Sequence, residues 1–370
     1  MAVPLLDLKA QHATIRDEVV AAMMQVVDEQ TFILGDPVGA LECSIAGLSQ
    51  TKYAVGCANG TDAILIALRA LGVGPGDEVV TTPFTFFATA GAIHNVGAKP
   101  VFVDINPRTF NINPAAIAAA ITPRTKAIIA VDLFGQMAAI EQVIAAAGDL
   151  PVIEDAAQTI GASRMIAGKR VMAGEATTIG TFSFFPSKNL GGYGDGGMIV
   201  TQDDQLFDRM MKLRTHGSRK TYYHEMVGYN SRLDTLQAAV LHAKLPHLEA
   251  WSAGRRANAD FYDAAFADVA EITTPYIESE NTSIYNQYTI RVRAREALQT
   301  FLKGKGIGNA VYYPLSLHQQ ACFAYLGYSE GAFPESERAA KEVLSLPVYP
   351  ELSAAQRDEV VAVVRGFFGR

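Results

Sequence analysis

The chain has 370 residues, of which 49% are hydrophobic, and a formal net charge of -7. A chain of this length exceeds what one apolar core usually covers, so we expect two domains. The acidic balance argues against a nucleic-acid partner, and no apolar run is long enough to span a membrane. The first residues lack a secretory signal pattern, and the three cysteines (Cys43, Cys57 and Cys322) are widely spaced and form no CxxC motif. We therefore expect a cytoplasmic protein with reduced thiols.

Strand-like and helix-like segments alternate over the first two-thirds of the chain. Helices are predicted at 63–71, 115–121 and 138–147, and strands at 78–82, 100–104, 126–131, 151–155, 178–185 and 197–201. Short, continuous apolar runs are typical of buried parallel strands. The alternation predicts an α/β fold, with a mostly parallel central sheet flanked by helices and a ligand site beyond the carboxyl ends of the strands.

The pattern changes in the last third of the chain. Long helices are expected at 231–250 and 251–266, and half-exposed strands at 286–293 and 310–314. Three more helices follow, at 295–305, 336–344 and 354–368. This order predicts a large domain over residues 1–250 and a smaller α+β C-terminal domain over residues 251–370.

One lysine has unusual neighbours. Lys188 ends the segment Ser183-Phe-Phe-Pro-Ser-Lys188 and precedes a turn with five glycines among residues 191–197. Buried lysines are rare and usually serve nucleophilic or Schiff-base chemistry, and glycines let the backbone approach a bound group closely. Lys188 is therefore a candidate for binding a cofactor aldehyde. The alternative is a solvated lysine beside a flexible loop.

Three further segments supply what such a cofactor needs. Asp155 ends a predicted strand, where a carboxylate keeps a pyridine nitrogen protonated or, alternatively, caps the next helix. Gly60 and Thr61 open a predicted helix, whose first N–H groups form an anion site or are an ordinary cap. Phe86 follows a strand and either stacks on a planar ring or packs in the core. Together these residues indicate a pyridoxal phosphate site.

The same residues carry a family resemblance. The chain resembles the sugar aminotransferases of the DegT/DnrJ/EryC1/StrS family, which are fold type I pyridoxal phosphate enzymes. The matching motifs extend over nearly the whole chain and include Ala58-Asn-Gly-Thr-Asp62, Glu154-Asp-Ala-Ala-Gln158, Ser183-Phe-Phe-Pro-Ser-Lys188 and Gly194-Asp-Gly-Gly197. Some relatives replace the lysine with histidine and act as sugar dehydratases, so the lysine favours aminotransfer.

The resemblance implies a role for each matching position. Lys188 is expected to bond the cofactor aldehyde and then to act as general base and acid. Asp155 is expected to pair with the pyridinium nitrogen, Gln158 to lie against the ring near its 3-hydroxyl, and Phe86 to stack on the opposite face. The phosphate is expected to bind a cup of three residues: Gly60, Thr61 and Ser183.

The resemblance also implies a homodimer with shared active sites. Asn230 is expected to reach the phosphate of the cofactor in the neighbouring subunit. The expected reaction transfers an amino group from L-glutamate to a nucleotide-linked keto sugar, with pyridoxamine phosphate formed between the two half-reactions. Ping-pong kinetics follow from such a scheme.

The sugar is the least determined part of the prediction. Segments 216–239 and 281–285 look most like those of enzymes that aminate UDP-2-acetamido-2-deoxy-3-oxo-glucuronate for O-antigen and related polysaccharides. Arg232 is the candidate to bind the sugar carboxylate, or it forms an ion pair with Asp234 or another neighbour. These relatives have a His-Tyr pair where this chain has Tyr312-Tyr313, and both tyrosines are candidates to contact the sugar. His318 is a further candidate to contact the sugar, because the segment Pro314-Leu-Ser-Leu-His318 resembles the broader family that aminates dTDP-3-keto or dTDP-4-keto sugars. Alternatively, His318 is a surface histidine.

Two other classes of function remain open at this stage. A cofactor-binding regulator without turnover would not need the complete set of Asp155, Gln158 and Lys188. A desulfurase would need a nucleophilic cysteine near the cofactor, and neither Cys57 nor Cys322 has an evident activating context.

Overall fold

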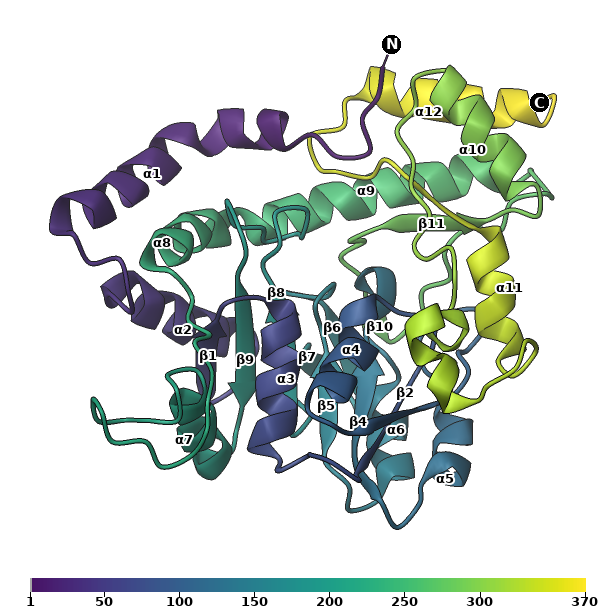
Figure 1. Cartoon of the computed structure of the whole chain (residues 1–370). Coiled ribbons are helices and arrows are strands. Elements are labelled where there is room, and N and C mark those ends of the chain that lie inside the picture. Colours follow the sequence, from purple (N-terminus) through teal and green to yellow (C-terminus); the bar gives the residue numbers. More distant parts are fainter. Residues whose placement is uncertain (1) are drawn as a thin grey trace.

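A seven-stranded sheet forms the centre of the molecule. The structure is a computed structural model and describes residues 2–370. The strand order is β1-β9-β8-β5-β4-β2-β3 (Figure 1). The strands are β1 (Tyr53–Cys57), β2 (Glu78–Thr81), β3 (Lys99–Phe102), β4 (Thr125–Val131), β5 (Val152–Asp155), β8 (Ile179–Ser183) and β9 (Gly197–Thr201). Strands β3, β2, β4, β5 and β8 are parallel, whereas β9 runs antiparallel to both of its neighbours, β1 and β8. The predicted α/β fold with a mostly parallel sheet is confirmed.

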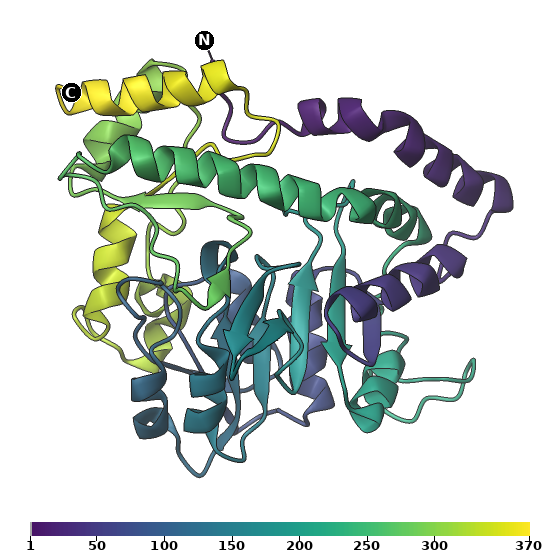
Figure 2. The ribbon, with the colours of Figure 1, turned by 180° about the vertical axis from the view of Figure 1, so that it is seen from behind.

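Helices cover both faces of this sheet. On one face lie α3 (Gly60–Ala70), α4 (Phe87–Asn95) and α7 (Asp204–Leu213), which share an apolar core with the sheet. On the other face lie α2 (Asp36–Leu48), α5 (Ile117–Ala120), α6 (Ile140–Ala147) and α8 (Thr235–Lys244). Figures 1 and 2 show the two layers from opposite sides. The strands are buried on both sides, which explains their continuous apolar runs.

The C-terminal part has an apolar core of its own. It contains α9 (Leu248–Phe266), the antiparallel pair β11 (Tyr288–Arg291) and β12 (Val343–Leu346), α10 (Arg295–Gly304), α11 (Pro334–Glu342) and α12 (Ala354–Phe367). This separate core supports the proposed division near residue 250. Val3, close to the start of the chain, also packs in it and pairs with Ile307.

The remaining elements connect these two parts. Helix α1 (Leu8–Glu29) lies against α8 and α9, and its buried face includes Ile15 and Val19. A small sheet joins β6 (Ser163–Ile166), β7 (Lys169–Met172) and β10 (Asn281–Thr282). The short 3-10 helices are η1 (Pro114–Ala116), η2 (Leu133–Gly135), η3 (Leu245–His247), η4 (Leu317–Gln319) and η5 (Ala321–Leu326). Within residues 2–370, no helix is both long enough and apolar enough to cross a bilayer.

Several predicted elements differ in extent from the structure, and three of these differences have a clear physical reason. The helix expected at 231–250 begins at Thr235 and is interrupted by η3, because Pro246 has no N–H group for a helical hydrogen bond. The strand expected at 310–314 is absent, since only Ala310 bridges to Ser345 before the chain turns toward the cavity described below. The helix expected at 336–344 ends at Glu342, where the fully buried residues of β12 pair with β11.

Candidate active site

A cavity lies at the carboxyl ends of the central parallel strands. Its volume is about 480 Å³, within the range of about 300–1,000 Å³ that is usual for small-molecule sites. It brings together nine of the twelve residues predicted from the sequence: Gly60, Thr61, Phe86, Asp155, Gln158, Ser183, Lys188, Tyr312 and Tyr313. These residues come from α3, from the ends of β5 and β8, from the loop after β2, and from the loop between α10 and η4. The topology therefore places them where an α/β sheet binds its ligand.

Lys188 is the only lysine or arginine on the wall of this cavity, within the described chain. Its backbone N–H donates to the Phe185 carbonyl at 2.9 Å, which closes the turn after β8. Burial lowers the pKa of the Lys188 amine to about 8, and the negative charge of Asp155 partly offsets this shift. In residues 2–370 the amine has no hydrogen-bond acceptor. An amine that is partly neutral near pH 8 is a suitable nucleophile for a carbonyl group.

Asp155 is 5% exposed and lies at the end of β5. One oxygen, Oδ2, accepts a hydrogen bond from the Thr89 hydroxyl at 2.8 Å, and the other, Oδ1, accepts a long bond of 3.4 Å from the Ala157 N–H. Burial raises the pKa of Asp155, while Thr89 and the charge of Lys188 oppose that rise. A buried carboxylate that keeps free acceptor capacity is suited to a cationic N–H donor such as a pyridinium.

The N-terminus of α3 forms a cup for an anion. Asn59 caps the helix by accepting a hydrogen bond from the Asp62 N–H at 2.8 Å. The next N–H groups, those of Gly60 and Thr61, begin the helix and have no acceptor within it. A Cβ atom on Gly60 would lie 2.7 Å from the Cβ of Ser183, so this close approach requires glycine. The hydroxyl groups of Thr61 and Ser183 and the positive end of the α3 dipole thus surround one small space, which suits a phosphate group.

Gln158 and Tyr313 form the next part of the wall. The Gln158 Oε1 atom accepts a hydrogen bond from the Phe134 N–H at 2.6 Å, and Nε2 lies 3.4 Å from the Tyr313 hydroxyl. Phe86 precedes α4 and remains 57% exposed, with its ring centroid 6.1 Å from that of Tyr313. An exposed aromatic face beside a fixed amide is able to hold a planar ring. The residues of the cavity therefore fit pyridoxal phosphate at its aldehyde, pyridine and phosphate positions.

Three predicted residues lie outside the cavity. Asn230 is exposed and pairs with Thr215, and Arg232 forms no ion pair with Asp234 or with any other carboxylate in residues 2–370. His318 is only 3% exposed, so it is not a surface histidine. Its Nε2 lies 3.0 Å from Glu337, and its ring packs against Phe333 in a separate apolar cluster. The proposed contact between His318 and the sugar therefore has no support in the structure.

Sequence reasoning missed several polar residues of the site. Thr89 binds Asp155 directly, and Asp132, Asp195 and Gln287 line the cavity. Thr85 lies before the start of α4, whereas Thr89 is within it, so their four-residue spacing is not a helix-face pattern. The sequence therefore offered no signal for this pair or for its carboxylate partner.

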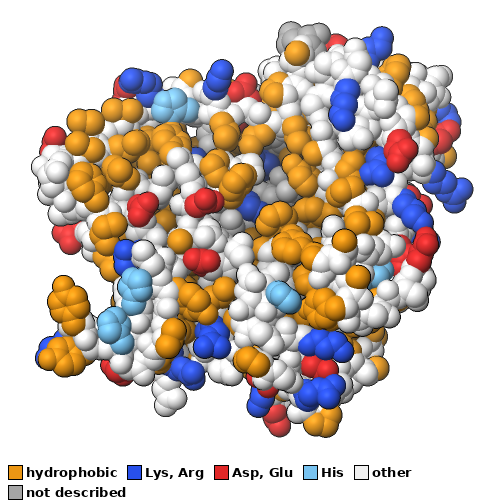
Figure 3. Space-filling model, viewed as in Figure 1, with side chains coloured by type: hydrophobic (Ala, Val, Ile, Leu, Met, Phe, Trp, Pro, Cys, Tyr) orange, Lys and Arg blue, Asp and Glu red, His pale blue; other side chains and the backbone are white. Residues whose placement is uncertain are grey.

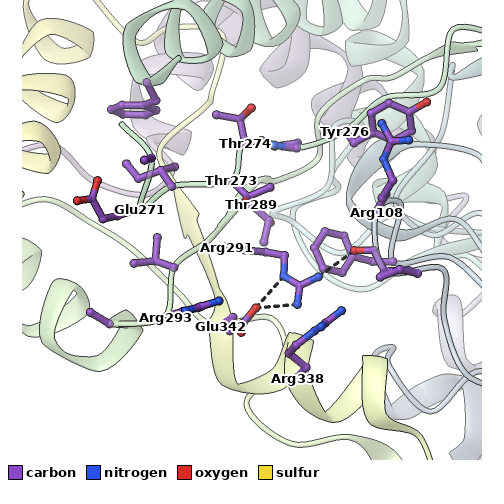
Figure 4. A pocket seen from close by; sticks show the side chains of 18 of the residues that line it. Arg108, Glu271, Thr273, Thr274, Tyr276, Thr289, Arg291, Arg293, Arg338 and Glu342 are labelled. Carbon is purple, nitrogen blue, oxygen red and sulfur yellow. Dashed lines mark hydrogen bonds and ion pairs between the residues drawn. The ribbon is translucent and has the colours of Figure 1, made fainter. Parts of the chain in front are cut away.

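A second cavity is larger but lacks this chemistry. Its volume is about 1070 Å³, and it lies beside β11 and α11 in the C-terminal part (Figure 4). Arg291 in this cavity is already paired with Glu342 and donates to the Pro107 carbonyl, and the Arg108 guanidinium stacks on the Tyr276 ring. None of the predicted site residues lies there. Size alone therefore does not identify the active site.

Three curated relatives cover almost the full chain. A "Pleiotropic regulatory protein" of Geobacillus stearothermophilus is 53% identical, with 100% of this chain and 99% of the relative covered. A UDP-N-acetyl-3-dehydro-alpha-D-glucosamine 3-aminotransferase of Acidithiobacillus ferrooxidans is 47% identical, covering 98% and 97%. A UDP-2-acetamido-2-deoxy-3-oxo-D-glucuronate aminotransferase of Pseudomonas aeruginosa is also 47% identical, covering 95% and 97%.

Solved structures show the same fold. The structure of DesV of S. venezuelae in complex with a ketimine intermediate is 38% identical and has a TM-score of 0.96, covering 100% of this chain and 99% of that one. The structure of NtdA of Bacillus subtilis with bound cofactor PMP is 30% identical and has a TM-score of 0.92, covering 100% and 86%. The predicted fold type I aminotransferase with a pyridoxal phosphate cofactor is thereby confirmed. A family model matches residues 13–365, and the chain belongs to the DegT/DnrJ/EryC1/StrS aminotransferase family.

Proposed function

We propose that the protein transfers the amino group of L-glutamate to the 3-keto group of a UDP-linked 2-acetamido sugar, with UDP-2-acetamido-2-deoxy-3-oxo-glucuronate as the first candidate. The observation that carries the catalytic part is the free Lys188 amine, with its lowered pKa, in one cavity with Asp155 and the phosphate cup. The sugar is supported by the names of two relatives that are each 47% identical to this chain. Formation of a polysaccharide precursor, such as one for O-antigen, is the corresponding biological role.

When bound, pyridoxal phosphate supplies an aldehyde and an electron-accepting ring. Residues of the chain transfer the proton, keep the ring protonated and bind the phosphate. The Lys188 amine takes a proton from the α-carbon of the donor and returns it during transfer, which its pKa of about 8 allows near neutral pH. Asp155 holds the proton on the pyridine nitrogen, and the N-terminus of α3 binds the phosphate.

We also propose a homodimer in which each subunit completes the other's site. Exposed apolar side chains occur on α1 and the segment after it (Leu8, Val20, Met24, Val27, Phe32, Ile33 and Leu34). Hydrophobic side chains gather on that side of the molecule in Figure 3. A patch of this kind is typical of a protein interface. Asn230 and Arg232 lie outside the cavity of their own chain, so the partner subunit's Asn230 and the partner subunit's Arg232 are the residues proposed to reach the phosphate and the sugar carboxylate.

This arrangement matters for the choice of sugar. The cavity wall of a single chain offers no cation besides Lys188 among the described residues, so a uronate carboxylate depends on the partner's Arg232. Tyr312 and Tyr313 line the cavity and are the sugar contacts proposed from the same chain. The alternative substrate is a dTDP-3-keto or dTDP-4-keto deoxysugar.

We further propose a cytoplasmic location, supported by three cysteines that form no disulfide within residues 2–370.

The best-matching relative reported above is named a regulatory protein, which favours a second candidate, a pyridoxal phosphate-binding regulator without turnover. Incubation of the purified holoprotein with L-glutamate separates the two. An aminotransferase converts the bound cofactor to pyridoxamine phosphate and releases 2-oxoglutarate in equal amount. A regulator shows neither change. Lys188→Ala is expected to abolish this half-reaction, whereas Lys126→Ala, on an exposed strand position, is expected to leave it intact.

The sugar is tested by mass-spectrometric turnover with UDP-3-keto and dTDP-keto sugars, including the uronate. Arg232→Met is expected to reduce turnover of the uronate far more than turnover of the neutral UDP-2-acetamido-3-keto sugar. Equal losses on both sugars would exclude Arg232 as the carboxylate ligand. Mixing Lys188→Ala and Asn230→Ala homodimers is expected to restore part of the activity, because a mixed dimer contains one intact shared site.

A further inference from the structure

A line of two hydroxyl groups ends on the catalytic carboxylate. The Thr85 and Thr89 hydroxyl oxygens are 3.1 Å apart, and the Thr89 oxygen is 2.8 Å from Asp155 Oδ2. All three side chains are buried, with exposures of 2%, 0% and 5%. Neither threonine belongs to the residues predicted to bind cofactor or sugar. The contacts therefore indicate a role that acts through Asp155.

Counting hydrogens fixes the direction of these bonds. An ionised carboxylate only accepts hydrogen bonds, so Thr89 must donate to Asp155. A hydroxyl has a single hydrogen, so the Thr89 oxygen must accept from Thr85 in turn. Both hydroxyl dipoles therefore point toward Asp155, and each bond strengthens the next. This arrangement stabilises the ionised form of the carboxyl against the desolvation that raises its pKa.

The same bonds decide which carboxylate oxygen is available. Oδ2 is held by Thr89 at 2.8 Å, whereas Oδ1 has only the Ala157 N–H at 3.4 Å. Oδ1 therefore has the greater capacity for another donor. Because Thr89 lies on α4 and Asp155 ends β5, the bond also fixes the rotation of the carboxyl group relative to the cavity wall.

We propose that Thr89, supported by Thr85, is a positioning residue that keeps Asp155 ionised and directs its Oδ1 atom at the pyridine nitrogen of the cofactor. This inference rests on the aminotransferase function above, but it does not depend on which sugar is the substrate. In this proposal α4 helps to keep the pyridine ring of the cofactor protonated, through Thr89, and it begins directly after Phe86.

The test compares three variants of the full-length protein. Thr89→Val keeps the shape of the side chain and removes the hydroxyl, Thr89→Ser keeps the hydroxyl and removes the methyl group, and Thr85→Val removes only the supporting donor. Affinity for pyridoxal phosphate is measured on cofactor-free protein by titration. Thr89→Val is expected to weaken binding on the order of tenfold, because a hydrogen bond to a charged group is lost. Thr89→Ser is expected to stay within about threefold of the parent protein, and Thr85→Val to fall between these two.

A cofactor analogue separates positioning from packing. In 1-deazapyridoxal phosphate a C–H replaces the ring nitrogen, so the analogue has no group that pairs with Asp155. The Thr89→Val penalty is expected to disappear with the analogue. An equal penalty with both cofactors, or a Thr89→Ser variant as weak as Thr89→Val, would overturn the proposal and indicate a packing role. Failure of the parent protein to bind pyridoxal phosphate at all would instead contradict the proposed function.

Discussion

Gly60 and Ser183 approach so closely that a Cβ atom on Gly60 would lie 2.7 Å from the Cβ of Ser183. This contact joins the first turn of α3 to the end of β8, two elements that are far apart in the sequence. Ser183 is fixed in the central sheet by its pairing with Gly197, so it has little freedom to move away. The space between the two residues is therefore set by the absence of a side chain at position 60.

Gly60→Ala is expected to displace either the helix start or Ser183 and to weaken pyridoxal phosphate binding on the order of tenfold or more, because phosphate contacts depend on both elements. Titration of cofactor-free protein measures the effect. Gly39→Ala is the matched control, since a Cβ there meets nothing within 4 Å. That control is expected to keep the parent affinity and to gain up to about 1 kcal/mol of stability from helix propensity. Unchanged affinity in Gly60→Ala would contradict the proposal that the cofactor phosphate binds between the start of α3 and Ser183.

The sequence predicted those parts of the site that consist of local motifs at the ends of elements. Lys188, Asp155 and Gly60 are such cases, because a strand end or helix start determines where the side chain lies. Contacts made by packing between separate elements were not predictable in this way. Thr89 meets Asp155 only because α4 and β5 share the apolar core on one face of the sheet. His318 is buried beside Glu337, which lies on α11. Single residues beside turns give no signal for such partners.

The lowered pKa of Lys188 predicts a distinct labelling profile. In cofactor-free protein, the rate at which an amine-selective acylating reagent modifies Lys188 is expected to rise with pH to a midpoint near 8. Ordinary exposed lysines have midpoints about two units higher. The attraction of Asp155 stabilises the ammonium form and raises the pKa, so Asp155→Asn is expected to move the midpoint to lower pH. Peptide mass spectrometry gives the rate for each lysine. A midpoint for Lys188 equal to that of exposed lysines would contradict the burial argument.

A buried pair of carboxyl groups next to the site predicts an unusual pH dependence of stability. Asp132 and Glu154 are fully buried, and burial raises the pKa of both, with that of Asp132 well above its usual range. The unfolded chain releases these protons at lower pH than the folded one. The pair therefore destabilises the protein progressively as pH rises from about 4 toward the folded pKa values.

Glu154→Gln is expected to raise stability on the order of 1 kcal/mol at pH 8, with a smaller gain at pH 5. Glu154 Oε1 has no donor in the described chain, so an amide there is free to donate to Asp132. Asp132→Asn is the informative comparison. Both Asp132 oxygens already accept hydrogen bonds, from the Ala138 N–H and the Thr159 hydroxyl, so this change leaves one donor unsatisfied. Thermal unfolding at several pH values measures the stability of both variants. Equal changes in stability would refute the proposal that Glu154, and not Asp132, has an oxygen without a donor.

A buried ion pair links β1 to two helices behind the phosphate cup. Arg214, 4% exposed, donates to Glu42 and, at 3.0 Å, to the Gly56 carbonyl, while the Gly56 N–H donates to Glu42 at 2.7 Å. Arg214→Met leaves Glu42 charged without its partner, which for a buried pair costs about 3–5 kcal/mol at pH 7. The loss is expected at the lower end because the Glu42 side chain is 16% exposed and retains some hydration.

A surface control makes this expectation specific. Arg256→Met removes an ion pair with Glu249, whose side chain is 73% exposed, and is expected to cost no more than about 1 kcal/mol. Chemical unfolding followed by circular dichroism gives the free energies. If both arginine variants lost the same stability, the burial of the Arg214–Glu42 pair would not be the cause.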